Sequence, residues 1–588
     1  ENMKKNIYYG VMMVAAGILS ATSCTDFDDY NDARHDANPS ADQTLWENIS
    51  GDSELTHFAS LLKKTGYDKV LSSANSYTVW APVDGKLDLA QYENMDSAQL
   101  VLEFVKNHVA DYSYGVSGTW TEPKRIRMQN DKSFDFANNG TCSFDGINVT
   151  KLNVPSSNGV MHKIDGVAQY YPNISAFLNN NAKTTALGID SLVAYYRKYN
   201  MSYLDVDNSV IGPIVDGKQT YIDSVIVNYN FMDSKLRAYM DAEDSSYTMV
   251  LPTNEAWKAE VEKGLAYYKF KEKLPYRGLD NSGNIVDQTY SMKEIAYLKD
   301  SLAKYDLFRS LVYSNNSRYN KWLTGDQTVP TDTLLSTRRN KLSNPQEILG
   351  KQEGDKIQLS NGQAYVVSSY AAHPWEVYSP EMNITASPSS VLKVTLGTGS
   401  NANFTINNGQ KESRRYSFYY VQPSGKSCPT LDISLPNVKS DTYNIYAVFA
   451  PGYSKSTNTI DTLPNQYKFN LYYAKAGDKE TSTNIWRFSS DGVENPEKEN
   501  KQQAFTVYND YEHRTDASGM LLADTLLLGK MTFPVSYAGT DVGPTLQIKV
   551  PFLTAAQQKN FSREIRLISI ILRPVAQDEY NANATKED

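Results

Sequence analysis

Cysteine is the scarcest informative residue in this chain. Only three of the 588 residues are cysteines, namely Cys24, Cys142 and Cys428. Three thiols cannot form the dense disulfide framework that stabilises small secreted domains. The fold must therefore depend on packed cores, and the length of the chain predicts several of them.

Positive charge is also in deficit. The chain has 58 lysines and arginines against 67 aspartates and glutamates, a formal net charge of −9. No basic stripe interrupts this acidic balance, so we expect no nucleic-acid partner.

Recognisable catalytic and metal motifs are missing as well. The sequence contains no His-Glu-x-x-His motif and no Gly-x-Ser-x-Gly motif, and its six histidines are scattered singly. These motifs supply the zinc ligands or the activated serine of common hydrolases. We expect no enzymatic activity, no catalytic residue, no metal and no cofactor.

What the chain does contain is an internal repeat. Residues 76–87 recur as residues 246–257, displaced by 170 positions. In the first copy Pro82 ends a β-forming run because it lacks an N–H, and Asp84 can cap the helix that follows. The second copy has proline and asparagine in the matching places, so each copy predicts a strand that runs into a helix.

A second pair of segments keeps the same order. Asn158-Gly159 recurs as Asn361-Gly362, displaced by 203 positions. Asn-Gly before an apolar run predicts a hairpin turn into a buried strand. Because 203 exceeds 170 by 33, the second repeat carries extra chain, which we assign to residues 264–300.

These segments resemble the fasciclin domain. The first repeat has all three of its motif regions, with Asn107-His108-Val109 in the middle one, and the second keeps the outer two. The resemblance implies two α+β fasciclin-like domains at residues 44–172 and 173–378, the second divergent. His108 and His162 fall on motif positions, where we expect hydrogen-bonded core histidines.

The remainder of the chain is rich in strand patterns. A Ser/Pro-rich linker is predicted at residues 379–390, and residues 391–575 are predicted to form an all-β sandwich of jelly-roll type, similar in its ending to the galactose-binding kind. The polar tail, 576–588, is predicted to be disordered. The nine predicted strands are 391–396, 416–421, 431–435, 443–449, 467–473, 505–508, 525–533, 546–550 and 565–572.

The N-terminus has the pattern of a secretory leader at residues 1–23. Lys4 and Lys5 precede an apolar run of about a dozen residues, too short for the ~20 that cross a bilayer. Small residues before Cys24 resemble the bacterial lipobox, which implies a lipid on this thiol. The alternative is an ordinary cleaved leader.

An acidic tether, residues 24–43, follows the cysteine. It contains Asp26, Asp28 and Asp29, which resemble the signal that exports lipoproteins of gut-type Gram-negative anaerobes to the outer face of the outer membrane. We therefore expect a lipid-anchored protein that faces the extracellular side.

Aromatic residues are the best candidates for ligand contact. Trp486 and Arg487 precede a Ser/Asp/Gly turn in the predicted sandwich, and Trp375 lies in the hinge before it. Tryptophan rings can pack against the apolar faces of sugars. The alternative is that these residues only pack the fold.

The resemblance also implies a function. Fasciclin-like lipoproteins with this layout are similar to accessory subunits of SusC/SusD-type uptake systems. The expected partners are then a TonB-dependent transporter and a SusD-like lipoprotein, and the expected ligand is a glycan or a peptide. The alternative function is adhesion to a cell or matrix through the fasciclin-like domains.

Overall fold

A computed structural model describes the chain from residue 39 to residue 587, except 216, 272–273, 280–284, 291, 327, 409–411, 455–458, 461–462, 476, 478–483, 510–512, 515–521 and 541–542. The predicted leader, the lipid-accepting Cys24 and the acidic signal at Asp26, Asp28 and Asp29 lie outside the described residues. Within the described part, no helix is both long and apolar enough to cross a membrane.

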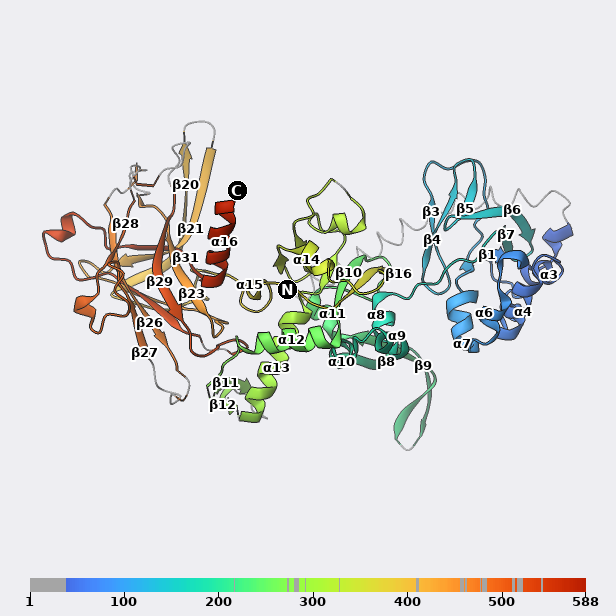
Figure 1. The fold of residues 1–588 in the computed structure, drawn as a ribbon, viewed down its shortest axis with the longest axis horizontal. Coiled ribbons are helices and arrows are strands. Elements are labelled where there is room, and N and C mark those ends of the chain that lie inside the picture. Colours follow the sequence, from blue (N-terminus) through green and yellow to red (C-terminus); the bar gives the residue numbers. More distant parts are fainter. Residues whose placement is uncertain are drawn as a thin grey trace. The chain divides into compact units, whose positions relative to one another are not determined.

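The chain divides into two compact units (Figure 1). The first comprises the described residues up to Phe177 together with Met240–Ser245 and Gln358–Gly362. The second comprises Leu178–Tyr239, Ser246–Ile357 and the chain from Gln363 onward.

The first unit is built on a seven-stranded sheet with the order β2-β1-β7-β6-β5-β4-β3. Its strands are β1 (Tyr77–Pro82), β2 (Val109–Asp111), β3 (Lys124–Arg127), β4 (Ser133–Asn138), β5 (Cys142–Phe144), β6 (Ile147–Ser156) and β7 (Gly159–Ile164). Its helices include α3 (Leu45–Ser50), α4 (Thr56–Thr65), α5 (Tyr67–Val70), α6 (Leu89–Glu93), α7 (Ser97–Leu100) and α8 (Ile174–Leu178).

The two predicted motif strands lie side by side in this sheet. All six residues of β1 are buried, and β1 pairs in parallel with β7, placing Tyr77 opposite Gly159. At Gly159 the backbone has φ +146°, and a Cβ there would lie 1.9 Å from the carbonyl oxygen of Tyr77. Only glycine fits this approach, which explains the Asn-Gly turn before the buried strand.

Strand alternation gives β1 two apolar cores, one on each face. Val79 packs into the core made with the helices, whereas Trp80 packs into a second core with the β3–β5 strands. There the Trp80 ring stacks on Phe144, with a centroid distance of 4.4 Å. Cys142 also lies in this second core, where burial raises the pKa of its thiol to about 11.

The second repeat is built on a four-stranded sheet with the order β13-β10-β17-β16. This is the order of β2-β1-β7-β6 in the first repeat, with β10 and β17 in the places of β1 and β7. The strands are β10 (Tyr247–Pro252), β13 (Val312–Ser314), β16 (Ile357–Leu359) and β17 (Gly362–Val367), with a two-stranded sheet β14 (Leu334–Leu335) and β15 (Lys341–Leu342).

Helices and two hairpins complete this repeat. The stretch assigned as extra chain, 264–300, holds the β11–β12 hairpin (Leu274–Leu279 and Ile285–Tyr290) and the start of α13. A longer hairpin, β8 (Asn200–Val215) with β9 (Lys218–Asn230), precedes the strand motif. The helices are α9 (Asn181–Ala186), α10 (Asp190–Arg197), α11 (Phe231–Leu236), α12 (Asn254–Leu265), α13 (Met292–Phe308), α14 (Pro345–Leu349) and α15 (Pro374–Val377).

The C-terminal sheet region, residues 382–574, contains two six-stranded sheets. One has the order β20-β21-β31-β23-β29 with β18 also on β31, and the other β19-β22-β30-β26-β27 with β28 also on β26. The strands are β18 (Met382–Thr385), β19 (Val391–Thr395), β20 (Gly397–Asn408), β21 (Glu412–Pro423), β22 (Thr430–Ser434), β23 (Thr442–Phe449), β24 (Tyr453–Ser454), β25 (Thr459–Ile460), β26 (Asn465–Tyr473), β27 (Asn484–Phe488), β28 (Phe505–Val507), β29 (Asp524–Thr532), β30 (Thr545–Lys549) and β31 (Ile565–Pro574).

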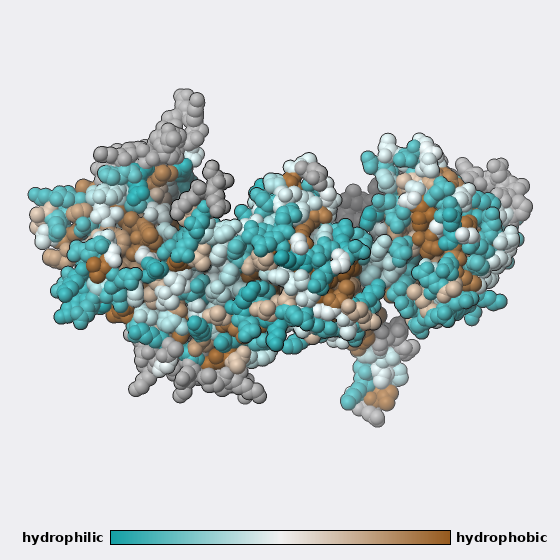
Figure 2. Space-filling view, in the orientation of Figure 1, coloured by the Kyte–Doolittle hydropathy of each residue, from teal (hydrophilic) through white to brown (hydrophobic). Residues whose placement is uncertain are grey.

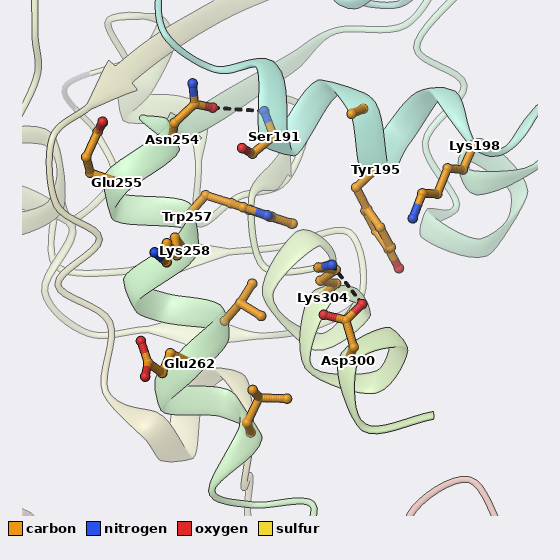
Figure 3. A pocket seen from close by; sticks show the side chains of 13 residues that line it. Ser191, Tyr195, Lys198, Asn254, Glu255, Trp257, Lys258, Glu262, Asp300 and Lys304 are labelled. Atoms are coloured by element: carbon orange, nitrogen blue, oxygen red, sulfur yellow. Dashed lines mark hydrogen bonds and ion pairs between the residues drawn. The ribbon is translucent and has the colours of Figure 1, made fainter. Parts of the chain in front are cut away.

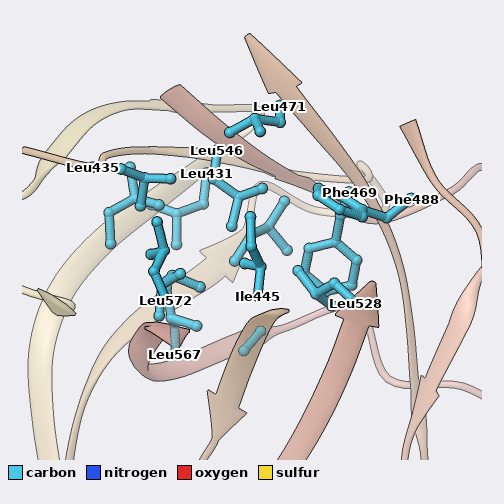
Figure 4. Packing of buried hydrophobic residues seen from close by; sticks show 14 of the residues in the cluster. Leu431, Leu435, Ile445, Phe469, Leu471, Phe488, Leu528, Leu546, Leu567 and Leu572 are labelled. Carbon is cyan, nitrogen blue, oxygen red and sulfur yellow. The ribbon is translucent and has the colours of Figure 1, made fainter. Parts of the chain in front are cut away.

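Both sheets contribute side chains to one apolar core (Figure 4). Ile445 and Leu572 from the first sheet and Leu431, Leu471 and Leu546 from the second belong to the same buried cluster. Each of the nine predicted strands coincides with a strand of this region.

Two predictions about the ends of this region are wrong. The predicted linker contributes β18, which pairs antiparallel with β31, because the alternating Met382 and Ile384 pack on the core despite the Ser/Pro-rich surroundings. The predicted disordered tail is helix α16 (Val575–Glu587). Asp578 attaches this helix to β23 by accepting hydrogen bonds from Asn444 (2.6 Å) and Tyr446 (3.0 Å). The helix therefore packs through polar contacts and lacks the apolar stripe that would have predicted it from the sequence.

Candidate functional site

A groove between α10, α12 and α13 is a candidate site in the second unit (Figure 3). Its volume is about 810 Å³. The residues that line it are Ser191, Ala194, Tyr195, Lys198, Asn254, Glu255, Trp257, Lys258, Val261, Glu262, Leu265, Asp300 and Lys304.

The repeated strand-to-helix motif positions this groove. Asn254 begins α12, and its side-chain oxygen accepts a hydrogen bond from the backbone N–H of Ser191 (2.8 Å) in the first turn of α10. The backbone N–H of Asn254 in turn donates to the carbonyl of Gly188 (2.7 Å). Because one residue joins the starts of both helices, α10 and α12 are fixed side by side.

The floor of the groove is aromatic but closed. Trp257 and Tyr195 have their ring centroids 5.9 Å apart, and Phe308 packs against both. Trp257 is only 3% exposed and Tyr195 only 5%. Burial also raises the pKa of the Tyr195 hydroxyl far above its ordinary value. Rings this buried cannot offer an open face for a sugar to stack on.

The rim of the groove carries charges of both signs. Figure 3 shows Lys258 and Glu262 on α12, and Lys304 of α13 pairs with Asp300 at 2.7 Å. Glu255 and Lys198 complete the rim. Such a rim can pair with a ligand that itself carries both charges, as a peptide does.

The predicted ligand residue Trp375 lies elsewhere, in an aromatic stack. Its ring packs on His373 with a centroid distance of 4.4 Å and an interplanar angle of 6°, and Tyr580 of α16 lies 5.6 Å away. His373 also contacts the side-chain amide of Asn344 at 3.0 Å. Neighbouring side chains therefore already contact the ring of Trp375.

The predicted pair Trp486 and Arg487 does not form a joint site. The two residues are consecutive on β27, so their side chains point to opposite faces of the sheet. Trp486 packs against the core, whereas the guanidinium of Arg487 donates to the carbonyls of Pro496 (3.4 Å) and Glu497 (3.3 Å). The structure thus separates the ring from the charge that the sequence places together.

The two motif histidines are buried and hydrogen-bonded, which confirms their prediction as core residues. His108 donates from Nδ1 to the carbonyl of Phe104 (2.8 Å) and accepts at Nε2 from the N–H of Ala168 (3.1 Å). His162 donates from Nε2 to the carbonyl of Tyr114 (3.0 Å). Burial lowers the pKa of each to about 4, so both are neutral at neutral pH.

Sequence reasoning missed the groove, although three of its residues, Asn254, Glu255 and Trp257, lie in the repeated segment 246–257. Trp257 is the last residue of that segment, and Tyr195 lies in α10. The signal that could have drawn attention to α12 is the spacing of Lys258 and Glu262, four residues apart on one helix face. Asp300 lines the same groove only because of how α13 packs, which no local pattern shows.

In the part of the chain that the structure describes, no group of three or more His, Cys, Asp or Glu side chains could hold a metal ion. The groove lining, all of it described, offers carboxylates, ammonium groups and amides for binding contacts.

Comparison with known proteins gives one specific result. Residues 53–169 match the model of the fasciclin domain, which covers the first of the two predicted repeats. No curated protein matches the chain.

Two solved structures are among those similar to this chain. The FAS1 domain pair of the insect cell adhesion molecule Fasciclin I is 14% identical, covering 56% of this chain and 99% of its own, with a TM-score of 0.20. A Paenibacillus xanthan lyase is 11% identical, covering 37% of this chain and 16% of its own, with a TM-score of 0.18. On the evidence of the model match at residues 53–169, the chain is a fasciclin domain-containing protein.

Proposed function

We propose that the chain is a non-catalytic binding protein of a bacterial cell surface. The observation that carries this proposal is the fasciclin domain at residues 53–169, because this domain suggests a role in binding or adhesion.

The second repeat is proposed to be a divergent fasciclin-like domain. Its sheet order β13-β10-β17-β16 repeats the order β2-β1-β7-β6. Asn361 also makes the contacts that Asn158 makes in the first repeat: its oxygen accepts from the N–H of Ile174 (2.9 Å), and its nitrogen donates to the carbonyls of Met240 (2.8 Å) and Ala242 (3.0 Å).

The C-terminal sheet region is proposed to be a β-sandwich of jelly-roll type. Two antiparallel sheets sharing one core support this, as does the even alternation of buried and half-buried residues along β23.

The ligand of the groove is proposed to be a peptide rather than a neutral glycan. The aromatic floor is closed, whereas Lys258 and Glu262 present both charges at the rim. A direct test measures binding of short zwitterionic peptides to the purified full chain by calorimetry, with a neutral oligosaccharide as the comparison.

Variants sharpen that test. Lys258→Ala and Glu262→Ala should each weaken peptide binding by about tenfold, the value of one charged hydrogen bond. Glu347→Ala and Lys351→Ala, outside the groove lining, are the matched controls and should leave binding unchanged. Equal effects of all four variants, or tighter binding of the oligosaccharide, would contradict the proposal.

Attachment is proposed to occur through a lipid on Cys24, at the outer face of the outer membrane. The leader pattern and the acidic residues after the cysteine support this placement. Cys24→Ser should release the protein from the membrane fraction, and protease added to intact cells should digest the wild-type protein. Membrane retention of the variant would overturn the lipid anchor.

The chain is further proposed to act as an accessory subunit of a SusC/SusD-type uptake system. Purification of the tagged protein from outer membranes in mild detergent should recover a TonB-dependent transporter and a SusD-like lipoprotein in fixed proportion. Recovery of the protein alone would exclude this role.

Adhesion is the second candidate, and the fasciclin match itself favours it. The two functions separate in one experiment. If the chain is an adhesin, cells that carry it attach to a matrix-coated surface, and the groove variants attach equally well. If it captures peptides, the groove variants lose capture and no attachment depends on the chain.

A further inference from the structure

The β8–β9 hairpin, here called the arm (Asn200–Asn230), carries an unusual concentration of exposed apolar side chains. Nine of the 26 exposed large apolar residues among the described residues lie within it. They are Met201, Tyr203, Val206, Ile211, Ile214, Val215, Val225, Ile226 and Tyr229.

The arm is a two-stranded sheet to which the described chain adds no third strand. A lone hairpin is at best marginally stable in water, and natural proteins seldom leave this much apolar surface on one. In Figure 1 the arm extends away from the helices of its own unit, and in Figure 2 apolar surface is visible near its far end. These features are typical of a segment whose apolar surface is covered by a binding partner.

Met201 and the two tyrosines nearest the base of the arm share one face. Met201 pairs with Tyr229 and Tyr203 pairs with Val227 across the strands, so alternation places them on one side with the next pair, Asp205 and Val225. This arm face is also internally packed, since the Tyr203 and Tyr229 rings lie 5.9 Å apart and the Tyr229 hydroxyl lies 3.4 Å from the sulfur of Met201. On the opposite side Ser202 pairs with Asn228, and Leu204 pairs with the exposed Ile226.

The edges of the arm are poorly suited to accept another strand. Its register shifts three times between Asp205 and Ile214, and Pro213 has no N–H to donate. Bulges and proline are devices that block edge-to-edge pairing. The arm is therefore built to dock through its face rather than to extend a sheet.

The charge of the arm selects the kind of partner. Between Asn200 and Asn230 the sequence has four aspartates, at positions 205, 207, 216 and 223, against the single Lys218, which gives 1 − 4 = −3. A second copy of the chain, itself at −9, or an anionic lipid surface would be repelled. A basic protein surface with an apolar centre complements both the charge and the arm face.

We propose that the arm docks, through Met201, Tyr203, Val225, Val227 and Tyr229, on a basic, apolar surface of a different protein. This interaction uses neither the groove nor the fasciclin domain at residues 53–169. Its test is therefore independent of the test of peptide binding in the groove.

The first experiment places a photocrosslinking amino acid in the full chain, in the cells that make it. Positions 203 and 229 probe the arm face, and positions 202 and 228 are the matched controls on the other side of the same strands. We expect one discrete protein adduct from 203 and 229 only, with the crosslinked peptide of the partner rich in Lys or Arg beside apolar residues. An adduct of two copies of the chain, a lipid adduct, equal adducts from both faces or no adduct would each overturn the proposal.

The second experiment measures the affinity of the purified chain for the protein so identified. Tyr203→Ser combined with Tyr229→Ser should weaken binding by roughly tenfold or more, as loss of aromatic anchors does, and Ser202→Ala combined with Asn228→Ala should change it less than about twofold. Raised salt should also weaken binding, because the surfaces are oppositely charged. All four side chains are exposed, so each variant should keep the wild-type unfolding temperature. If the tyrosine variant binds as tightly as the wild type, the arm face is not the docking surface.

Discussion

The two repeats of this chain share a framework and differ in what is built on it. In both, a buried strand is followed by a residue whose side chain caps a helix, Asp84 in the first repeat and Asn254 in the second. In both, an asparagine before a glycine also makes hydrogen bonds to three backbone groups. In the first repeat β3, β4 and β5 extend the sheet and enclose Trp80. In the second, Val250 occupies the place of Trp80 and the additional chain forms helices and hairpins instead.

This difference shows which residues the framework requires. The contacts of Asn158 recur at Asn361. The backbone N–H of Trp80 donates to the carbonyl of His108 (3.0 Å), and the backbone N–H of Val250 donates to the carbonyl of Leu311 (3.0 Å) in the same way. The side chains at those positions do not recur. Backbone contacts are thus retained where core side chains have been exchanged, and the family match is confined to the repeat that keeps the aromatic core.

Acid should separate the two repeats most strongly. The first has His108 and His162, whose pKa burial lowers to about 4, and the second has Leu311 and Tyr365 at those positions. Above the ordinary histidine pKa of 6.5 both histidines are neutral whether folded or unfolded. As the pH falls from 6.5 towards 4, only the unfolded chain takes up the protons, so the first repeat should lose about 3 kcal/mol per histidine.

Hydrogen exchange on the full chain, corrected for intrinsic rates, can measure this loss separately in each repeat. Peptides of the first repeat should lose protection as the solution is acidified, while those of the second change less. His108→Gln and His162→Gln should reduce the dependence on pH. Parallel loss in both repeats would show that the histidines are not the cause.

Removal of the repeated asparagine tests the shared framework and should have the next largest effect. Asn158 is 6% exposed and Asn361 2%, and each makes three hydrogen bonds to backbone groups. Asn158→Ala and Asn361→Ala should each lower the free energy of unfolding of their own repeat by about 3 kcal/mol. The exposed Asn139, changed to alanine, is the control. A loss in only one repeat would mean that the second copy of the contact is not structural.

The caps should show the smallest effect. Asp84 accepts hydrogen bonds from the N–H groups of Thr56 (3.0 Å) and His57 (2.8 Å) at the start of α4, while Asn254 accepts one from Ser191. Asp84→Ala should cost about 1–2 kcal/mol and Asn254→Ala about 1 kcal/mol, as judged by chemical denaturation monitored region by region. Asp84→Asn should recover most of the loss; failure to do so would mean that charge, rather than hydrogen bonding, matters at this cap.

Local patterns predicted most of the fold. The motif strands, the Asn-Gly turns and nine strands of the C-terminal sheet region each depend on a short stretch of sequence, and the structure contains them all. β20 escaped prediction because Gly397–Asn408 is rich in Gly, Asn and Ser, which have low β-propensity, and it forms through pairing with β21 along its length.

The candidate sites were harder to predict than the fold. The groove combines Tyr195, Trp257 and Asp300 from three helices, and only tertiary packing brings them together. Adjacency in sequence predicts a joint site at Trp486 and Arg487, but neighbouring residues on a strand point to opposite faces. Linear proximity is informative at the Asn-Gly turns and misleading along a strand. It is misleading at Asp84 as well, because this residue caps the earlier helix α4 and not the helix that follows it.

The parallel pairing of β1 with β7 has a consequence for biosynthesis. Tyr77 meets Gly159, a partner 82 positions later, so β1 must wait for most of its repeat to be made before its second neighbour exists. Such distant pairings close slowly. A nascent chain that has passed Pro82 but not Ile164 presents an apolar strand with an open edge, and in this interval the chain depends most on chaperones.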